Sequence, residues 1–284
     1  MAQYGGAYRG TQAAAVERVG RRVAVQSGLS ESGSDFTVTL LDSPVENAFA
    51  IPGGYIYVTR QLLALMNSEA ELAAVTGHEV GHVAARHSAK RESRSRIGGL
   101  AAAVLGAATG SDLVGRAAGM GSQLYTLGFS RTQEYEADGL GVRYMTAAGY
   151  DPYAEADILA ALNDETALQG AISGKGAGQP TWMSTHPNGA DRVKRARALA
   201  VATGRPEAAP AQDVAFLRML DGLPYDGGDK QVRVVAVQPG DTPERLAARM
   251  AYRDRQLERF TVLNGLDPAA PLAPGRLVKL IVAR

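Results

Sequence analysis

The sequence predicts an α+β fold, with a mainly helical domain that holds a small antiparallel sheet and a smaller C-terminal module. Two patterns lead to this prediction. Short alternating stretches between residues 36 and 59 are typical of strands, whereas longer stretches with helical spacing fill most of residues 68–200. A strand, two helices and a strand with their own apolar set follow. We therefore expect a domain at 1–205, a linker at 206–230 and a module at 231–284.

The composition limits the possible functions before any motif is considered. With 284 residues and 45% hydrophobic content, the chain can bury a substantial core. Its 30 basic and 29 acidic residues leave a net charge of +1, which gives no reason to expect a nucleic-acid partner. The chain has no cysteine, which excludes disulfides and thiolate metal sites. Any metal must therefore be held by histidines and carboxylates.

The first predicted elements are a helix and three strands. Valines recur at helical spacing within residues 11–29, which indicates a surface helix. Alternation at 36–40 predicts the first strand, and two further strands at 45–51 and 55–59 flank a Pro-Gly-Gly turn. A small sheet therefore directly precedes the next helix.

That next helix carries the most informative motif of the chain. His78-Glu79-Val80-Gly81-His82 is the HEXXH pattern of zinc peptidases. Residues four apart share one face of a helix, so His78 and His82 can present two imidazole nitrogens to one metal ion. Glu79 flanks the site outside the coordination shell. Its carboxylate is free to take a proton from a metal-bound water.

The residues around the motif have the signals of a helix. Ser68 and Glu71 form an S-x-x-E capping box, and apolar residues from Leu72 to Val83 keep one side apolar. Gly81 lowers helix propensity by roughly 1 kcal/mol relative to alanine. A glycine between two ligands is explained if another segment must approach closely there. The alternative is a pair of histidines on a core or solvated helix.

Residues 97–121 are rich in glycine, alanine and small aliphatic residues. Their uninterrupted apolar run, 97–110, is well short of the ~20 residues that span a bilayer, so we expect no transmembrane segment. We expect a lid or an interfacial helix that could contact a membrane surface. A packed helical hairpin is the alternative.

A second helix with an acidic first turn is predicted from Ser130 to Gly149. Gln133 completes a capping box with Ser130. Glu134 and Asp138 stack one turn apart, where two like charges repel unless a cation lies beside them. A metal ion would be such a cation, and a solvated acidic patch is the alternative.

The third segment with metal-binding chemistry follows a glycine-rich stretch at 169–179, which we interpret as a flexible loop. It leads to Trp182, the only tryptophan, and to His186, one of four histidines. Pro187 favours an extended conformation at His186, and a helix follows through Arg192.

Four motifs in the same order resemble the zinc metallopeptidase family of the CAAX prenyl proteases and the HtpX heat-shock proteases, in particular its soluble periplasmic branch. The motifs are Asn47-Ala48-Phe49-Ala50-Ile51-Pro52-Gly53-Gly54 with Ile56 and Val58, the HEXXH helix, Glu134-x-x-Ala137-Asp138, and Thr185-His186-Pro187 with Arg192. The resemblance covers roughly residues 40–200 and implies a gluzincin-type fold with one zinc ion per chain.

The resemblance also implies roles for individual residues. Glu134 would be the third zinc ligand beside His78 and His82, and Asp138 would orient a ligating histidine from the second shell, with Arg192 nearby. His186 could stabilise the oxyanion or act as a fourth ligand that blocks the site.

Two further expectations concern the neighbourhood of the zinc. The segment Asn47, Ala48, Phe49 and Ala50 could hold an extended substrate by strand addition, although a sheet that only covers the core is an equal alternative. His87 does not fit the longer HEXXHXXGXXH pattern. On a continuous helix it would point to the opposite face, so we interpret it as structural.

The C-terminal module resembles LysM domains, which bind peptidoglycan. Val237-Gln238-Pro239-Gly240-Asp241-Thr242, Leu263-Asn264-Gly265-Leu266 and Leu272-Ala273-Pro274-Gly275 carry this resemblance. Pro243 and the five arginines among residues 245–259 depart from the usual pattern.

The function expected from these observations is a zinc endopeptidase that cleaves misfolded or unassembled envelope proteins. The N-terminus lacks the charged and apolar regions of a signal peptide, as a mature exported chain would, and we expect the periplasm or cell envelope of a Gram-negative bacterium. The alternative is a cell-wall-tethered binding or chaperone-like protein with a blocked or vestigial metal site.

Overall fold

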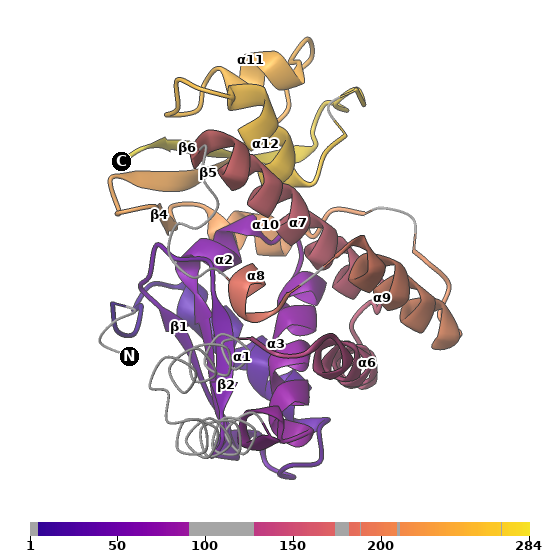
Figure 1. Ribbon diagram of the computed structural model, residues 1–284. Coiled ribbons are helices and arrows are strands. Elements are labelled where there is room, and N and C mark those ends of the chain that lie inside the picture. Colours follow the sequence, from indigo (N-terminus) through magenta and orange to yellow (C-terminus); the bar gives the residue numbers. More distant parts are fainter. Residues whose placement is uncertain (1–4, 91–127, 174–181, 188, 209–210, 268) are drawn as a thin grey trace, which may run out of the picture.

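Helix α3 (Glu69–Ala84) lies between a three-stranded sheet and helix α6 (Arg131–Ala147) in the computed structural model (Figure 1). The structure describes residues 5–90, 128–173, 182–187, 189–208, 211–267 and 269–284. Its other helices in these ranges are α1 (Gln12–Val25), α2 (Arg60–Leu65), α7 (Ala154–Ser173), α8 (Trp182–Thr185), α9 (Ala190–Ala202), α10 (Val214–Leu220), α11 (Pro243–Ala247) and α12 (Gln256–Asn264), with a short 3-10 helix η2 at Gly33–Asp35.

The strands form two separate sheets. The strands are β1 (Thr37–Leu41), β2 (Ala48–Ile51), β3 (Tyr55–Thr59), β4 (Pro224–Tyr225), β5 (Lys230–Ala236) and β6 (Leu277–Ala283). The first sheet has the order β1-β3-β2, and the second has the order β4-β5-β6.

The prediction of an antiparallel first sheet is correct for one of its two strand pairs. β2 and β3 form an antiparallel hairpin, but β1 pairs with β3 in parallel. The reason lies in the order of the strands. After β1, residues 42–47 lead the chain to β2, which is the outer strand on the far side of the sheet. The hairpin then places β3 between β1 and β2, so β3 runs in the same direction as β1. The fold is thus α+β with a mixed sheet.

The contact between α3 and α6 depends on glycine. A Cβ atom on Gly81 would lie 2.9 Å from the Ala137 carbonyl oxygen, and one on Gly77 would lie 3.0 Å from the Gly141 carbonyl oxygen. Only a residue without a side chain lets the two backbones approach so closely. The expectation of a close approach at Gly81 is therefore confirmed. This approach brings the first turn of α6 beside the histidines of α3.

Both helices begin at the predicted caps, but the box predicted at Ser68 is only half formed, because the Glu71 carboxylate accepts a hydrogen bond from the Asn67 backbone N–H instead of the Ser68 N–H. Ser68 Oγ accepts a hydrogen bond from the Glu71 backbone N–H, and Ser130 and Gln133 form a complete capping box. A cap of this kind stabilises a helix by about 1 kcal/mol. It also sets the residue at which each helix begins, and therefore the face on which the later residues lie.

The C-terminal elements pack on the rest of the chain. The module at 231–284 has the predicted order of strand, two helices and strand, with β5 and β6 antiparallel. The predicted linker at 206–230 contains α10 and β4, and β4 extends the second sheet. Buried residues form one hydrophobic core that includes Val16 of α1 and Ile281 of β6. The proposed domain boundaries stay a prediction.

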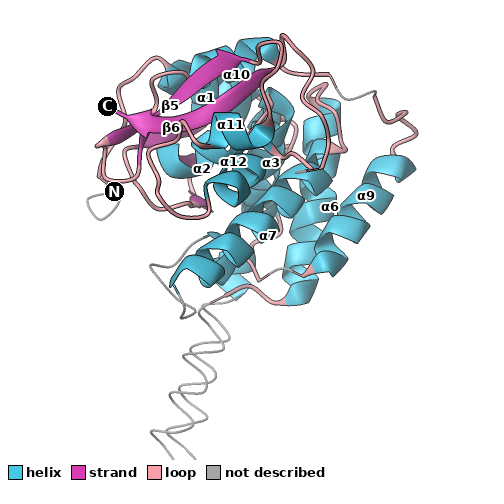
Figure 2. Cartoon of the chain, turned by 90° about the horizontal axis from the view of Figure 1, so that it is seen from above, coloured by secondary structure: helices cyan, strands magenta, loops and turns pink. Residues whose placement is uncertain are grey.

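A buried lysine joins the module to α2. The Lys279 side chain is 0% exposed, and its Nζ atom donates hydrogen bonds to the backbone carbonyls of Ala64, Leu65 and Met66. These carbonyls lie at the C-terminal end of α2, where helices leave acceptors without intrahelical partners. All three donors of the ammonium group are thereby satisfied. Figure 2, which views the molecule from above, shows β5 and β6 in front of α1.

Two expectations fall partly or wholly outside the described residues. The stretch 97–121 lies outside them. Of the predicted loop at 169–179, residues up to Ser173 belong to α7 instead, and residues 174–179 lie outside the described part. Within the described residues, no helix is both long enough and apolar enough to cross a membrane.

Candidate metal centre

The HEXXH helix directs two histidines toward one point. His78 and His82 lie one turn apart on α3, and their Nε2 atoms are 2.9 Å from each other. Both side chains are buried. Their Nδ1 atoms are engaged by other side chains, so the Nε2 atoms are the ones available to a shared ligand.

Helix α6 adds a carboxylate to this pair. Glu134 stands in the first turn of α6 and is 0% exposed. Its Oε2 atom lies 3.5 Å from His78 Nε2, and its Oε1 atom lies 3.5 Å from His82 Nε2. The sequence could place Glu134 only on a helix of unknown position. The glycine contact between α3 and α6 puts it opposite the histidines.

A third histidine completes the cluster. His186 follows the short helix α8, and its backbone N–H donates to the Trp182 carbonyl oxygen. The Trp182 backbone N–H in turn donates to the Glu46 carbonyl oxygen, which anchors this segment beside β2. His186 Nδ1 lies 3.2 Å from His78 Nε2 and 3.3 Å from Glu134 Oε1.

The geometry of these four groups fits a zinc ion. Zinc–nitrogen bonds of 2.0–2.1 Å place two tetrahedral ligand atoms about 3.3 Å apart. The distances between neighbouring donor atoms in the cluster run from 2.9 to 3.5 Å. Both Glu134 carboxylate oxygens are buried without a hydrogen-bond donor, although Arg192 Nη1 forms an ion pair with Oε2 at 2.7 Å. Histidine and carboxylate are also ligand types that zinc prefers.

Glu79 lies beside the cluster without belonging to it. Its Oε1 atom accepts a hydrogen bond from Trp182 Nε1 at 2.8 Å and lies 3.5 Å from His186 Nε2. The Trp182 ring stacks on the His186 ring with centroids 4.6 Å apart. One tryptophan therefore holds both Glu79 and His186. The sequence pointed to Trp182 only as the single tryptophan, and its role was not predicted.

His78 is supported by buried charged residues. Its Nδ1 atom donates to Asp138 Oδ1 at 2.9 Å, and Asp138 also accepts hydrogen bonds from Nε and Nη2 of Arg192. Asp138 and Arg192 are both buried. Glu155 lies close to Asp138 and His78. Burial, followed by the negative charge of Asp138, raises the pKa of Glu155 to about 8.

His82 is supported differently, and here the predicted orientation of His87 is wrong, although His87 is not one of the four clustered donors. His87 Nδ1 lies 2.9 Å from His82 Nδ1, and His87 Nε2 lies 3.1 Å from Glu136 Oε2. The prediction assumed a continuous helix, but α3 ends at Ala84 and Arg86 has a left-handed backbone with φ 54°. This turn brings the His87 ring back to the metal side.

The tautomers along this second support follow from ligation. If His82 binds a metal through Nε2, its Nδ1–H is the donor to His87 Nδ1, and His87 Nε2–H then donates to the Glu136 carboxylate. Phe129 stacks on the other side of the His82 ring, with centroids 3.9 Å apart. Neither contact has a signal in the sequence, because both join segments that are far apart or follow a non-helical turn.

The electrostatics of the cluster favour a cation at its centre. Burial lowers the pKa of His78, but its hydrogen bond with Asp138 and the nearby Glu134 carboxylate outweigh burial and raise this pKa to about 10. Burial and then the positive charge of His78 lower the pKa of His82 well below 6.5. Burial raises the pKa of Glu134, yet the adjacent imidazoles of His186 and His78 lower it overall. The site therefore stabilises a positive charge, either a proton or a metal ion.

The predicted substrate segment borders α3, the helix that carries two of the clustered histidines. β2 is an outer strand of its sheet and contacts α3. Asn47 and Ala48 are buried, and Phe49 stacks on Tyr57 of β3. The Asn47 backbone pairs with Thr59, so this end of the segment is part of the sheet.

Comparison with known proteins supports the assignment of the site. The profile of Peptidase family M48 matches residues 11–200. The beta-barrel assembly-enhancing protease of Yersinia pestis is 30% identical over 257 residues, which are 85% of this chain and 51% of that protein. The mitochondrial metalloendopeptidase OMA1 of Arabidopsis thaliana is 36% identical over 162 residues, 57% of this chain and 31% of that protein.

A fungal relative is also a metalloendopeptidase. The mitochondrial metalloendopeptidase OMA1 of Schizosaccharomyces pombe is 32% identical over 184 residues, 63% of this chain and 50% of that protein. The chain spans only about a third to a half of the length of these three relatives.

Proposed function

Because this chain belongs to peptidase family M48, we propose that it is a zinc-dependent endopeptidase whose metal is held by His78, His82 and Glu134. The observation that carries the proposal is the buried cluster of donor atoms at tetrahedral spacing, with Glu79 beside it. Zinc in such a site lowers the pKa of a coordinated water to about 7 and polarises the substrate carbonyl.

Glu79 is the general base in this proposal. Its carboxylate takes a proton from the attacking water and later delivers it to the leaving amine. The hydrogen bond from Trp182 Nε1 holds one carboxylate oxygen, which limits the orientations that Glu79 can adopt. Trp182 is then a positioning residue for the base.

We propose that His186 is a fourth ligand that blocks the site until its segment moves away. Its Nδ1 atom lies at ligand distance from the other donors, and the ring is buried under Trp182. A catalytic zinc needs an open position for water or substrate. The alternative, an oxyanion donor, requires the same ring to release the metal and present an N–H to the substrate.

The proposed substrates are misfolded or unassembled proteins of the bacterial envelope, and the proposed place of action is the periplasm. The similarity to a beta-barrel assembly-enhancing protease over 85% of this chain supports both. The soluble branch of the CAAX protease and HtpX type is the proposed position within the family. A substrate chain would lie along β2 and use main-chain hydrogen bonds, so many sequences could bind.

The proposed partner of residues 231–284 is peptidoglycan. The order of strand, two helices and strand agrees with a LysM-like module. A pull-down with insoluble peptidoglycan tests this proposal. Retention of the wild-type chain at moderate salt is the expected result, and no retention would leave the module with a structural role alone.

The central experiment compares two variants with the wild-type protein. Glu79→Gln should keep about one zinc ion per chain and lose casein cleavage by about 100-fold or more, because the base is removed and no ligand is. Glu134→Ala should lose most of the zinc. A chelator should abolish wild-type cleavage. Equal cleavage by wild type and Glu79→Gln would refute the proposed mechanism.

His186→Ala separates the two roles of that histidine. A blocking ligand predicts equal or higher turnover of an unfolded substrate and somewhat weaker zinc retention. An oxyanion donor predicts that turnover falls by about 100-fold with zinc affinity unchanged. The second result would refute the blocking role.

A further inference from the structure

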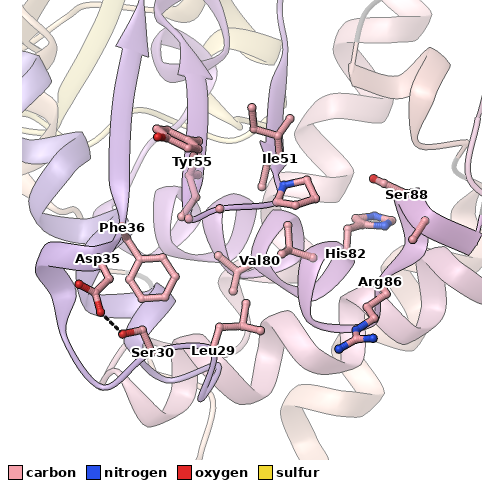
Figure 3. Close-up of a pocket in the computed structure, with 17 residues that line it drawn as sticks. Leu29, Ser30, Asp35, Phe36, Ile51, Tyr55, Val80, His82, Arg86 and Ser88 are labelled. Carbon is pink, nitrogen blue, oxygen red and sulfur yellow. Dashed lines mark hydrogen bonds between the residues drawn. The ribbon is translucent and has the colours of Figure 1, made fainter. Parts of the chain in front are cut away.

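A large cavity lies against the metal centre and has no role in the mechanism above. Its volume is about 610 Å³, and Figure 3 shows its lining. One wall is the end of α3, with Val80, His82 and Val83, and another is Ile51 at the end of β2. The imidazole of a proposed zinc ligand is thus part of the cavity wall.

The lining is mainly apolar, with polar groups at a few places. Phe36 comes from the segment after η2, Pro52 from the β2–β3 turn, and Leu29 from the loop after α1. Asp35, which hydrogen-bonds to Ser30, and Arg86 are the charged lining residues. A cavity of this composition favours an apolar group over a charged one.

The distribution of exposed apolar side chains points to the same place. Five large hydrophobic residues are more than 40% exposed in the described part of the chain. Three of them, Leu29 at 49%, Ile51 at 44% and Tyr55 at 43%, line this cavity. Single exposed apolar residues are common, but a cluster around a cavity marks a binding surface.

The position of the cavity suggests what binds there. A peptide on β2 would run beside α3, the helix that carries His78 and His82, and its side chains would alternate between the two sides of the extended chain. The cavity is formed jointly by β2 and by the end of α3 that carries His82. A side chain close to the bond being cleaved is therefore within reach of the cavity.

We propose that this cavity binds a large apolar side chain of the substrate, of the size of phenylalanine or leucine, next to the cleaved bond. The inference rests on the proposed peptidase function and extends it to a substrate preference. It agrees with unfolded proteins as substrates, because apolar side chains that are buried in a native protein become accessible when it fails to fold.

Peptide binding tests the proposal without needing turnover. Zinc-loaded Glu79→Gln, alone and combined with His186→Ala, would be titrated with fluorescent 12-residue peptides of alanine, serine and glycine. The central residue would be Phe, Leu, Ala or Asp. We expect the Phe and Leu peptides to bind roughly 10- to 100-fold more tightly than the Ala peptide, and the Asp peptide to bind most weakly.

Substitutions in the lining locate the preference. Leu29→Asp and Ile51→Asp, each in the same background, should reduce the preference for Phe over Ala to less than about threefold, because a charge in the cavity disfavours an apolar guest. Both residues are partly exposed, so the folded structure tolerates the change. Val201→Asp alters an exposed residue of α9 that does not line the cavity, and it should leave the preference unchanged.

The outcomes separate this inference from the proposed function. Equal affinity for the Phe and Ala peptides, including no binding of either, would overturn the inference, as would a preference that survives both lining variants. Cleavage sites of the wild-type enzyme in casein give an independent check. Efficient cleavage of casein without enrichment of apolar residues next to the cleaved bonds would contradict the cavity assignment alone. Selective binding of the Phe and Leu peptides, together with a wild-type protein that cleaves nothing, would contradict only the peptidase function.

Discussion

The two histidines of the HEXXH motif occupy equivalent positions on one helix but depend on different supports. His78 donates to Asp138, which Arg192 holds from the other side, and all three side chains are buried. His82 contacts His87, and His87 contacts Glu136, whose side chain is 49% exposed. One support is an interior charged network, and the other leads from the metal site to solvent.

Both supports solve the same chemical problem. A metal-bound histidine needs a partner for its second nitrogen, which selects the tautomer and orients the ring. The two supports differ in the free-energy cost of removing one of their side chains. A charge left unpaired in the interior keeps its full desolvation penalty, whereas water can replace a partner at the surface. The comparison therefore predicts unequal effects on zinc affinity for chemically similar substitutions.

The largest effect on zinc affinity is expected for Asp138→Asn. This change keeps the volume but removes the carboxylate that orients His78, so zinc affinity should fall roughly 100-fold. Arg192 would lose one of its two buried carboxylate partners, and the free energy of unfolding should fall by about 3 kcal/mol. Competition with a fluorescent chelator and urea unfolding measure the two quantities. A fall in affinity of less than about threefold would contradict the importance of this support.

His87→Ala is expected to have a smaller effect. His82 would lose the acceptor for its Nδ1–H, and zinc affinity should fall roughly tenfold, still leaving the protein largely metal-bound at micromolar zinc. His87→Gln offers a side-chain oxygen as an alternative acceptor and should recover part of the loss. If His87→Ala weakens binding as much as Asp138→Asn does, the proposed difference between the two supports is wrong.

Among the substitutions in the support of His82, Glu136→Gln should have the smallest effect on zinc affinity. The carboxylate is half-exposed, and the amide oxygen of glutamine or a water molecule can accept the same hydrogen bond. Zinc affinity should change by no more than about threefold. The same chelator competition measures it, with Asp138→Asn as the contrasting buried carboxylate. A fall in zinc affinity of tenfold or more would mean that the negative charge of Glu136 strengthens metal binding through its hydrogen bond with His87.

Trp182→Phe serves as a contrast, because it changes neither the partners of His78 nor those of His82. Phenylalanine keeps a ring against His186 but removes the hydrogen bond from Nε1 to Glu79. Zinc affinity should be unchanged, while kcat should fall about tenfold, because a hydrogen bond to a charged group is lost. Metal titration and peptide turnover on the same sample test both statements. Loss of zinc together with activity would show that Trp182 holds the ligands rather than the base.

Much of the metal centre follows from local patterns in the sequence. The spacing of His78 and His82 places them on one helix face whatever surrounds the helix, and Glu79 is necessarily offset from that face. The caps at Ser68 and Ser130 set where the two helices begin. Gly81 indicated a close neighbour at that point. These inferences succeed because each depends on interactions between residues only a few positions apart.

Other features arise only when distant segments meet. The parallel pairing of β1 with β3 depends on the route of residues 42–47, and Lys279 finds its acceptors at α2, more than 200 residues earlier. The turn at Arg86 brings His87 to His82, which a helical repeat could not anticipate. Trp182 reaches Glu79 across 103 positions. Periodicity and capping report the local conformation of the chain, whereas these contacts depend on how the helices and strands pack, so they became visible only in the folded structure.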